Sequence, residues 1–262
     1  MGTKGSYSGS PAGGEVRDGL DDWLASLPGA GGAPPPTGDG QAQPTLLSPL
    51  KPSSNTPAGR VLPAARLFSS SRGGGASARG RRSTDSLTRS VSGSARSAGR
   101  GAAAAYAYRT GDAQTLRDLG LDYDALRANP NVFDVVHQIA QKVCEDLPPG
   151  TIDTAEQMEV VGRLAEWLVE SDIAGAQVSL GQIAEEAVAL ILAEAYLVET
   201  ASTLNAKEMT GAQRAEFEDG VRQAAEELAA HANLTPAGPS PDEFTRAIED
   251  GLEYLRTIYE GH

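Results

Sequence analysis

From about residue 110 onward, apolar residues recur at the three- and four-residue spacing of amphipathic helices. Two short helices are expected first, over 112–119 and 122–128, ended by Gly120 and by Asn129-Pro130 respectively. Five longer helices are expected after them, over 132–146, from Asp153 to about 171, from Ser179 through Val198, from Thr210 through Leu228, and from Ser240 to about Tyr259.

The beginnings of the last four helices carry capping signals. A Ser, Thr or Asp is followed three residues later by Glu or Gln, so that each side chain can bond the other residue's backbone N–H. The four pairs are Asp153 with Glu156, Ser179 with Gln182, Thr210 with Gln213, and Ser240 with Glu243. No segment keeps a two-residue alternation, which excludes a sheet, and we predict an all-α fold, a bundle-like C-terminal array of helices.

The helix after Ser179 is apolar on nearly every side, because Val188, Leu190, Ile191 and Leu192 follow one another closely. A helix without a polar face is typically buried by its neighbours. The sequence therefore predicts that this helix lies at the centre of the domain.

Composition divides the chain. Residues 1–109 are rich in Gly, Pro and Ser and carry a net charge of +7, whereas residues 110–262 carry −20. The first part cannot bury enough apolar surface to offset the entropy of ordering, so a long disordered N-terminal region is expected. We predict a motif region at 1–28, a disordered linker and Arg-rich tract at 29–109, and an acidic helical domain at 110–262.

The Arg-rich tract, residues 60–109, contains ten arginines and one acid, Asp85. Gly and Ser make it a poor helix when free. Such a tract can bind nucleic acid non-specifically, although Phe68 is its only aromatic residue before Tyr106 that could stack on a base. Equally, it can lie on the acidic domain of its own chain, and the sequence leaves both readings open.

A short apolar island lies near the N-terminus. Leu20, Trp23, Leu24 and Leu27 have the spacing of one face of two helical turns. Eight residues cannot hold a helix alone. The island is therefore a docking motif that folds in a partner's groove, a stray apolar cluster, or a cluster that docks onto this chain's own domain.

Catalytic and metal-binding patterns are scarce. His137, His231 and His262 have no second His or Cys at metal-ligand spacing, and His137 is expected to be a structural histidine beside a core face. Cys144 is the only cysteine, and the pairs Glu185-Glu186 and Glu226-Glu227 are interpreted as solvated helix faces. We predict a protein that is not an enzyme and needs no metal or cofactor.

The cysteine count and the hydropathy of the chain also bear on its cellular location. One cysteine allows no disulfide framework, which fits a reducing compartment. No apolar run is long enough to span a membrane, and the N-terminus lacks the apolar core of a secretory signal. The expected location is cytoplasmic, without membrane association.

The first seven residues, Met1 to Tyr7, are small or polar apart from the two ends. A small second residue allows removal of Met1, which would leave the amine of Gly2 free. With a typical pKa of about 7.7–8.0, part of this unhindered amine is neutral and nucleophilic near neutral pH. The pattern Met1-Gly2 with Ser6 also matches an N-myristoylation signal, which would require a eukaryotic acyltransferase.

The opening Met1-Gly2-Thr3, then Ser6-Tyr7, Gly9-Ser10-Pro11 and the Leu20-Asp21-Asp22-Trp23 island, resembles the QatB family of the bacterial Qat anti-phage defence system. The order of a Pro/Gly linker, an Arg-rich tract and a helical domain is similar too. This resemblance implies three partners: the ATPase QatA, the QueC-like enzyme QatC and the TatD-like nuclease QatD.

Some QueC-like enzymes of defence systems attach a deazapurine to an N-terminal glycine, and the resemblance implies that Gly2 is the acceptor here. The residues implied to enter or contact the partner are Thr3, Lys4, Gly5, Ser6, Tyr7, Leu20, Trp23 and Leu24. Two functions are thus expected, a substrate and scaffold modified at Gly2, or a structural or nucleic-acid-binding adaptor that uses the Arg-rich tract.

Overall fold

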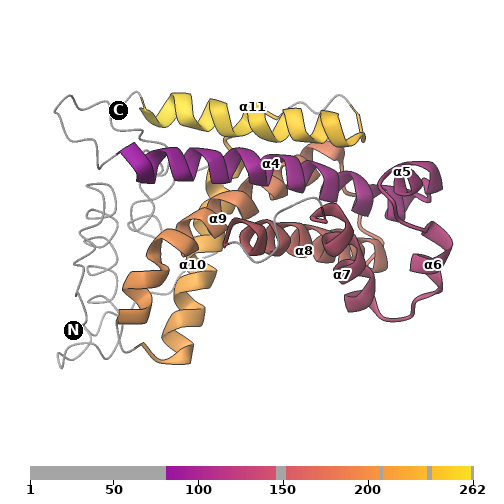
Figure 1. Ribbon diagram of the computed structural model, residues 1–262, viewed down its shortest axis with the longest axis horizontal. Helices are drawn as coiled ribbons and strands as arrows, with labels where there is room; N and C mark the ends of the chain where they lie inside the picture. Colours follow the sequence, from indigo (N-terminus) through magenta and orange to yellow (C-terminus); the bar gives the residue numbers. More distant parts are fainter. Residues whose placement is uncertain (1–80, 146–151, 207–208, 235–237, 261–262) are drawn as a thin grey trace, which may run out of the picture.

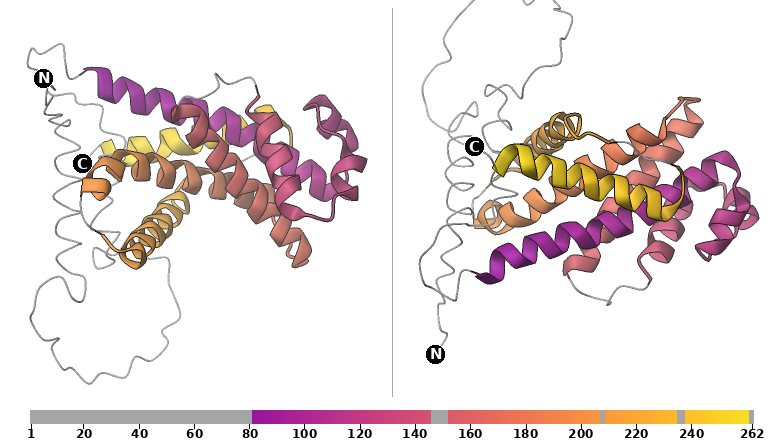
Figure 2. Two further views of the ribbon diagram at one scale, coloured as in Figure 1. Left: turned by 60° about the horizontal axis from the view of Figure 1, so that its bottom comes forward. Right: turned by 90° about the horizontal axis from the view of Figure 1, so that it is seen from above.

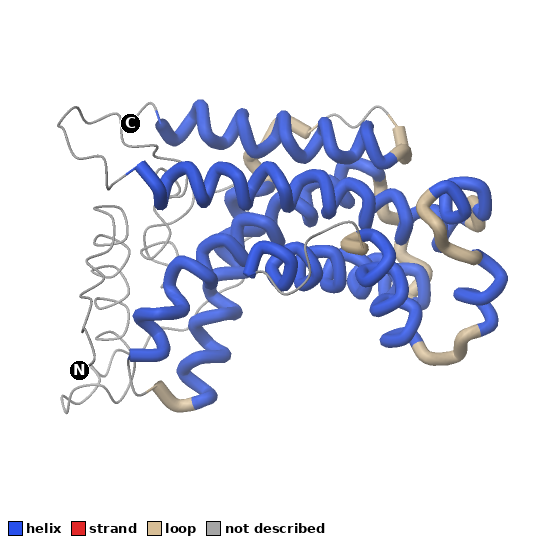
Figure 3. Tube along the Cα trace, in the orientation of Figure 1, coloured by secondary structure: helices blue, strands red, loops and turns tan. Residues whose placement is uncertain are grey.

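The computed structural model describes residues 81–145, 152–206, 209–234 and 238–260. Every regular element in these ranges is an α-helix, which confirms the all-α prediction (Figures 1 and 3). The helices are α4 (Arg81–Thr110), α5 (Ala113–Asp118), α6 (Tyr123–Ala128), α7 (Val132–Val143), α8 (Ile152–Ile173), α9 (Leu180–Ala206), α10 (Gly211–Ala229) and α11 (Pro241–Glu260).

The seven helices expected from residue 112 onward are all present. Thr210 and Gln213 form the predicted reciprocal capping box, in which the Gln213 backbone N–H donates to Thr210 Oγ1 over 3.2 Å. Ser179 and Ser240 make the same exchange with Gln182 and Glu243. One predicted cap is wrong. Helix α8 begins at Ile152, so Asp153 lies inside its first turn rather than before it.

The sequence did not predict α4. This helix covers residues 81–110, all but the last of which had been predicted as part of a disordered linker at 29–109, and its residues from Ala95 to Tyr108 are largely buried. The domain boundary at residue 110 is therefore wrong, because the packed unit includes α4. The expected disorder of residues 1–80 lies outside the described residues.

Helix α4 lies at the centre of the fold, packed against α5, α7, α8, α9 and α11 (Figures 1 and 2). Most of its buried residues are alanines, among them the consecutive run Ala102 to Ala105, which is covered on all sides. The predicted central helix, α9, is indeed buried along most of its length and contacts α4, α8, α10 and α11. Two helices rather than one thus form the centre.

Small residues let α4 approach its neighbours closely. A Cβ atom placed on Gly99 would lie 2.6 Å from the backbone nitrogen of Thr245 in α11, and one on Gly101 would lie 2.8 Å from Val161 Cγ1 in α8. Both distances are shorter than real Cβ contacts. Ser97 adds a buried hydrogen bond from its hydroxyl to the side-chain oxygen of Gln157 in α8. The glycines that lower helix propensity are therefore what the packing requires.

Helix α4 ends at Gly111, whose φ of 79° is in the left-handed region that favours glycine. The next backbone N–H, that of Asp112, donates to the carbonyl of Ala107 over 2.9 Å and closes the last turn. The Asp112 side chain then caps α5 by accepting from Gln114 and Thr115. The chain thereby turns sharply into the short helices at the end of the molecule (Figure 1).

Candidate functional site

The site residues expected from the sequence, Gly2, Thr3 to Tyr7, Leu20, Trp23 and Leu24, all lie outside the described residues. The structure therefore neither brings them together nor separates them. The candidate site in the described part of the chain is instead a groove on the surface formed by α8, α9 and α10.

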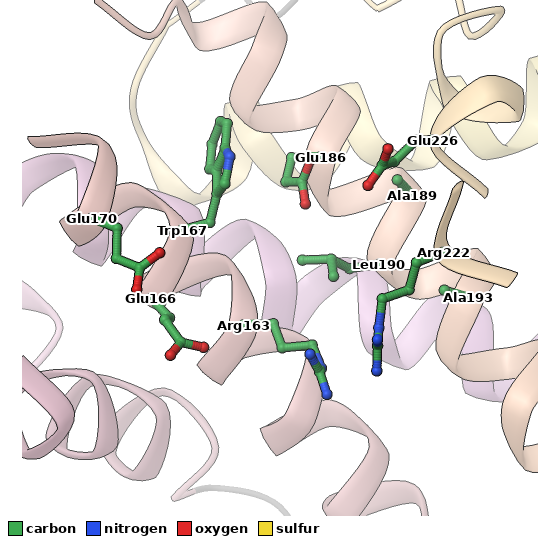
Figure 4. A pocket seen from close by; sticks show the side chains of 10 residues that line it. All are labelled: Arg163, Glu166, Trp167, Glu170, Glu186, Ala189, Leu190, Ala193, Arg222 and Glu226. Atoms are coloured by element: carbon green, nitrogen blue, oxygen red, sulfur yellow. The ribbon is translucent and has the colours of Figure 1, made fainter. Parts of the chain in front are cut away.

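The groove has a volume of about 340 Å³ (Figure 4). Helix α8 forms one wall, α10 forms the other, and α9, which contacts both, lies between them. The lining residues are Arg163, Glu166, Trp167 and Glu170 from α8, Glu186, Ala189, Leu190 and Ala193 from α9, and Arg222 and Glu226 from α10.

Helical spacing explains why these side chains line one groove. The four residues of α8 lie at positions i, i+3, i+4 and i+7, and so do the four of α9, while the two of α10 are four apart. Residues with this spacing share one face of a helix. Each helix therefore turns one continuous stripe toward the groove, and its larger apolar stripe toward the core.

The centre of the groove is apolar. Trp167 and Leu190 lie on facing helices and are half-buried against the core (Figure 4). Leu164 and Leu168, which flank Trp167 in α8, are fully buried. Trp167 is only partly buried against the core, and it also lines the groove.

The charges of the groove are unbalanced. Four glutamates line it, against two arginines. Both arginines pair with acids of their own helices that do not line the groove: Arg163 with Glu159 over 2.6 Å, and Arg222 with Asp219 over 3.0 Å. Among the described residues, no lysine or arginine forms an ion pair with the groove glutamates Glu166, Glu170, Glu186 and Glu226.

The excess of negative charge affects the pKa of Glu186. Its pKa is raised to about 6, chiefly by burial and further by the negative charges of Glu226 and Glu185. Farther along α9, the pKa of Glu194 is raised to about 7 by burial and by Glu159 and Glu156, whereas two arginines act in the opposite direction. The ionised forms of Glu186 and Glu194 are therefore destabilised, and a cation bound near them would stabilise them.

The sequence missed Glu186 and Glu226 as site residues. They belong to the two Glu-Glu pairs interpreted as solvated faces, and only one member of each pair lines the groove. The matching i, i+3, i+4, i+7 stripes of α8 and α9 are visible in the sequence. What could not be read was that these two stripes face one another.

Two other expectations concern single residues. His137, expected to be a structural histidine beside the core, is exposed on α7, so that prediction is wrong. Cys144 is buried, and this burial raises the pKa of its thiol to about 11, which keeps it protonated at neutral pH. In the described ranges, no three His, Cys, Asp or Glu residues gather as a metal site would need.

The described end of the Arg-rich tract binds the domain itself. Arg109 and Arg127 both lie near the carboxylate of Asp172 in α8, at 3.7 and 3.8 Å, and Arg109 also donates to the carbonyl of Ala176. The guanidinium of Arg127 lies 4.2 Å from the ring centre of Tyr108, a cation–π contact. At this position the tract neutralises an acid of its own domain.

Comparison of the chain with protein-family models, with curated proteins and with solved structures found no match. None of the helices in the described ranges combines the length and the apolar character needed to cross a membrane. The function must therefore be argued from the residues of this chain.

Proposed function

We propose that this protein is a non-catalytic subunit of an anti-phage defence complex, a substrate and scaffold that presents Gly2 to a QueC-like enzyme for deazapurine modification. The observation that carries the proposal is the opening Met1-Gly2-Thr3-Lys4-Gly5-Ser6-Tyr7, with its resemblance to the QatB family. Small residues next to Gly2 leave its amine unhindered, as entry into an active-site tunnel requires.

The helical domain supplies the scaffold in this proposal. Eighty residues precede α4. Fully extended, they reach at most about 260–290 Å. Because α4 is packed against α8, α9 and α11, the N-terminal segment continues directly into a helix of the packed domain. A pull on the N-terminal segment by a partner would therefore act directly on the folded unit.

The partners follow from the same resemblance. The QueC-like enzyme would bind residues 2–7, the Leu20-Trp23-Leu24 island would dock on it or on the ATPase of the system, and the domain would remain outside. The alternative adaptor function rests on the Arg-rich tract. It has less support, since Arg109 in this tract already pairs with Asp172 of the same chain.

Mass spectrometry of the N-terminal peptide tests the proposal. The full chain is expressed with and without the QueC-like partner, and the partner should add mass to the peptide that begins at Gly2. Gly2→Ala keeps a small second residue, so Met1 is still removed, but it hinders the amine and should sharply reduce modification. Gly5→Ala is the matched control and should remain modified.

A Gly2 amine that stays free in the presence of an active partner would overturn the proposal. Equal modification of the Gly2→Ala chain at an internal side chain would do the same. Deleting residues 2–9, so that Ser10 rather than another glycine follows Met1, should abolish modification without changing the helical circular dichroism, because no described helix includes these residues.

A further inference from the structure

The groove between α8, α9 and α10 has the properties of a docking site for a basic, amphipathic segment. It offers Trp167 and Leu190 as an apolar centre, flanked by carboxylates to which no described cation pairs. Glu186 on α9 and Glu226 on α10 repel each other across it. A guanidinium between them would replace this repulsion with two attractive interactions.

One stretch of the same chain has the complementary character. Residues 60–72 read Arg-Val-Leu-Pro-Ala-Ala-Arg-Leu-Phe-Ser-Ser-Ser-Arg, with three arginines, no acid, and the apolar residues Leu62, Leu67 and Phe68 between them. Arginine suits such a groove because its fork can bond two carboxylates, and its stem and plane can pack on an indole. We propose that residues 60–72 bind in the groove of their own chain.

The other apolar segments before α4 fit less well. The island at 20–27 contains a tryptophan and three leucines, but Asp21 and Asp22 lie inside it and Asp18 precedes it, so the groove glutamates would repel it. Leu46, Leu47 and Leu50 are accompanied by a single cation, Lys51. Only 60–72 combines large apolar side chains with several positive charges.

The connection between this segment and α4 is eight residues long, 73–80. Glu194, beside the Ala193 end of the groove, is close enough to Glu156 for their charges to interact, and the neighbouring Gln157 touches α4 near Gly93 and Ser97. From Gly93 back to the start of α4 is about 18 Å along the helix. Fully extended, the eight residues 73–80 can span about 26–29 Å, which is more than the distance from the start of α4 to Gly93.

Docking would extend a pattern already present at Arg109, where the Arg-rich tract pairs with an acid of the helical domain. It would also withdraw three arginines from any other anionic partner, nucleic acid included. The inference concerns residues 60–72 and does not depend on whether Gly2 is modified.

Limited trypsin digestion of the full chain tests the inference, because trypsin cleaves after arginine. Cleavage after Arg66, inside the docked segment, should be at least about tenfold slower than after Arg79, which lies outside it; this corresponds to a docking free energy of about 1.4 kcal/mol. Peptide mass spectrometry measures both rates in one sample. High salt, which screens charges beyond about 3 Å at 1 M, should narrow the difference.

Glu186→Gln/Glu226→Gln should raise the rate after Arg66 toward that after Arg79. Glu185→Gln/Glu227→Gln is the matched control: it removes the same charge from adjacent positions that do not line the groove, and protection should persist. Leu67→Ser/Phe68→Ser should also remove protection. Circular dichroism of each variant confirms that the helices are intact.

Equal cleavage after Arg66 and Arg79 in the unaltered chain would overturn the inference, and so would equal loss of protection in the control variant. Dilution provides a further criterion. Protection within one chain is independent of concentration, so protection that disappears on dilution would assign the groove to a second copy and refute the proposal. Protection that requires added nucleic acid would refute it as well.

Discussion

Replacing Gly99 of α4 with alanine should destabilise the protein, although alanine is the better helix former. The added Cβ would lie 2.6 Å from the backbone nitrogen of Thr245 and 2.8 Å from its Cα, whereas ordinary contacts begin at 3.4 Å. The obstacle is backbone, which cannot rotate away. Helices α4 and α11 would have to separate locally by about 0.6–0.8 Å, a gap that forfeits a quarter to a half of each contact's dispersion energy.

Two opposing effects set the magnitude. Overpacking of this kind costs about 1–3 kcal/mol, while replacing a mid-helix glycine with alanine gains up to about 1 kcal/mol. Gly162→Ala isolates the second effect, because Gly162 lies in the middle of α8 with open space around its missing Cβ. The difference in unfolding free energy between the two variants should therefore be about 1–3 kcal/mol, Gly99→Ala being the less stable.

Urea unfolding followed by far-UV circular dichroism measures this difference, provided that both variants unfold with the same dependence on urea. Thermal unfolding should agree, with midpoints separated by about 2–4 °C for each kcal/mol. If Gly99→Ala were as stable as Gly162→Ala, the close contact between α4 and α11 would be wrong, and with it the central position of α4.

Three further predictions concern other features. Glu194→Gln should stabilise the fold by about 1 kcal/mol at pH 8, a value reduced because the side chain is partly exposed. The pKa of Glu194 in the folded chain, about 7, lies above its ordinary value of 4.5, so the stability of the unaltered chain falls as the pH rises from about 4.5 through about 7. Urea midpoints measured across this range should show that the difference between the two chains vanishes below about pH 4.5. Thr210→Ala removes a capping box and should cost about 1 kcal/mol, whereas the exposed Thr257→Ala should change stability by less than about 0.5 kcal/mol in the same assay. A chain cut to 81–262 should unfold cooperatively in calorimetry, whereas one cut to 110–262 lacks α4 and should show no such transition.

The helices from residue 112 onward could be predicted because large apolar residues carry their periodicity and short polar residues mark their ends. In α7, for example, Val135, Ile139 and Val143 are all buried, as their spacing indicates. The capping bonds of Thr210 and Ser240 depend only on residues three apart. Such local signals need no knowledge of the tertiary structure.

Helix α4 could not be predicted in the same way, because its core face is built from alanine, glycine and serine. Ala95, Ala98, Ala102 and Ala105 do have helical spacing, and all are buried. Their side chains are too small to distinguish a packed helix from a low-complexity linker by hydropathy. The stabilisation arises from close approach to α8 and α11, which is a property of three helices together rather than of one segment.

The groove could not be predicted for a different reason. Its acidic residues stand out in the sequence, but the sequence alone favours their interpretation as solvated helix faces. A carboxylate pair such as Glu185-Glu186 is usually a solvated face, and for Glu185, which does not line the groove, that interpretation stays consistent with the structure. Glu186 differs because it is largely buried and because α10 brings Glu226 near it. Long-range placement of this kind follows from packing, which the linear pattern does not contain.

The position of α4 changes what the N-terminal part of the chain can do. With a boundary at residue 110, all ten arginines of the tract would belong to a linker and would be equally available to an anionic partner. With α4 in the core, Arg109 is held by Asp172, and eight residues, 73–80, connect the segment 60–72 to the packed domain. At Arg109, the tract is thus part of the helical domain and neutralises one of its acids. That leaves the first 28 residues, with Gly2 at their tip, as the part of the chain whose composition is best suited to an external partner.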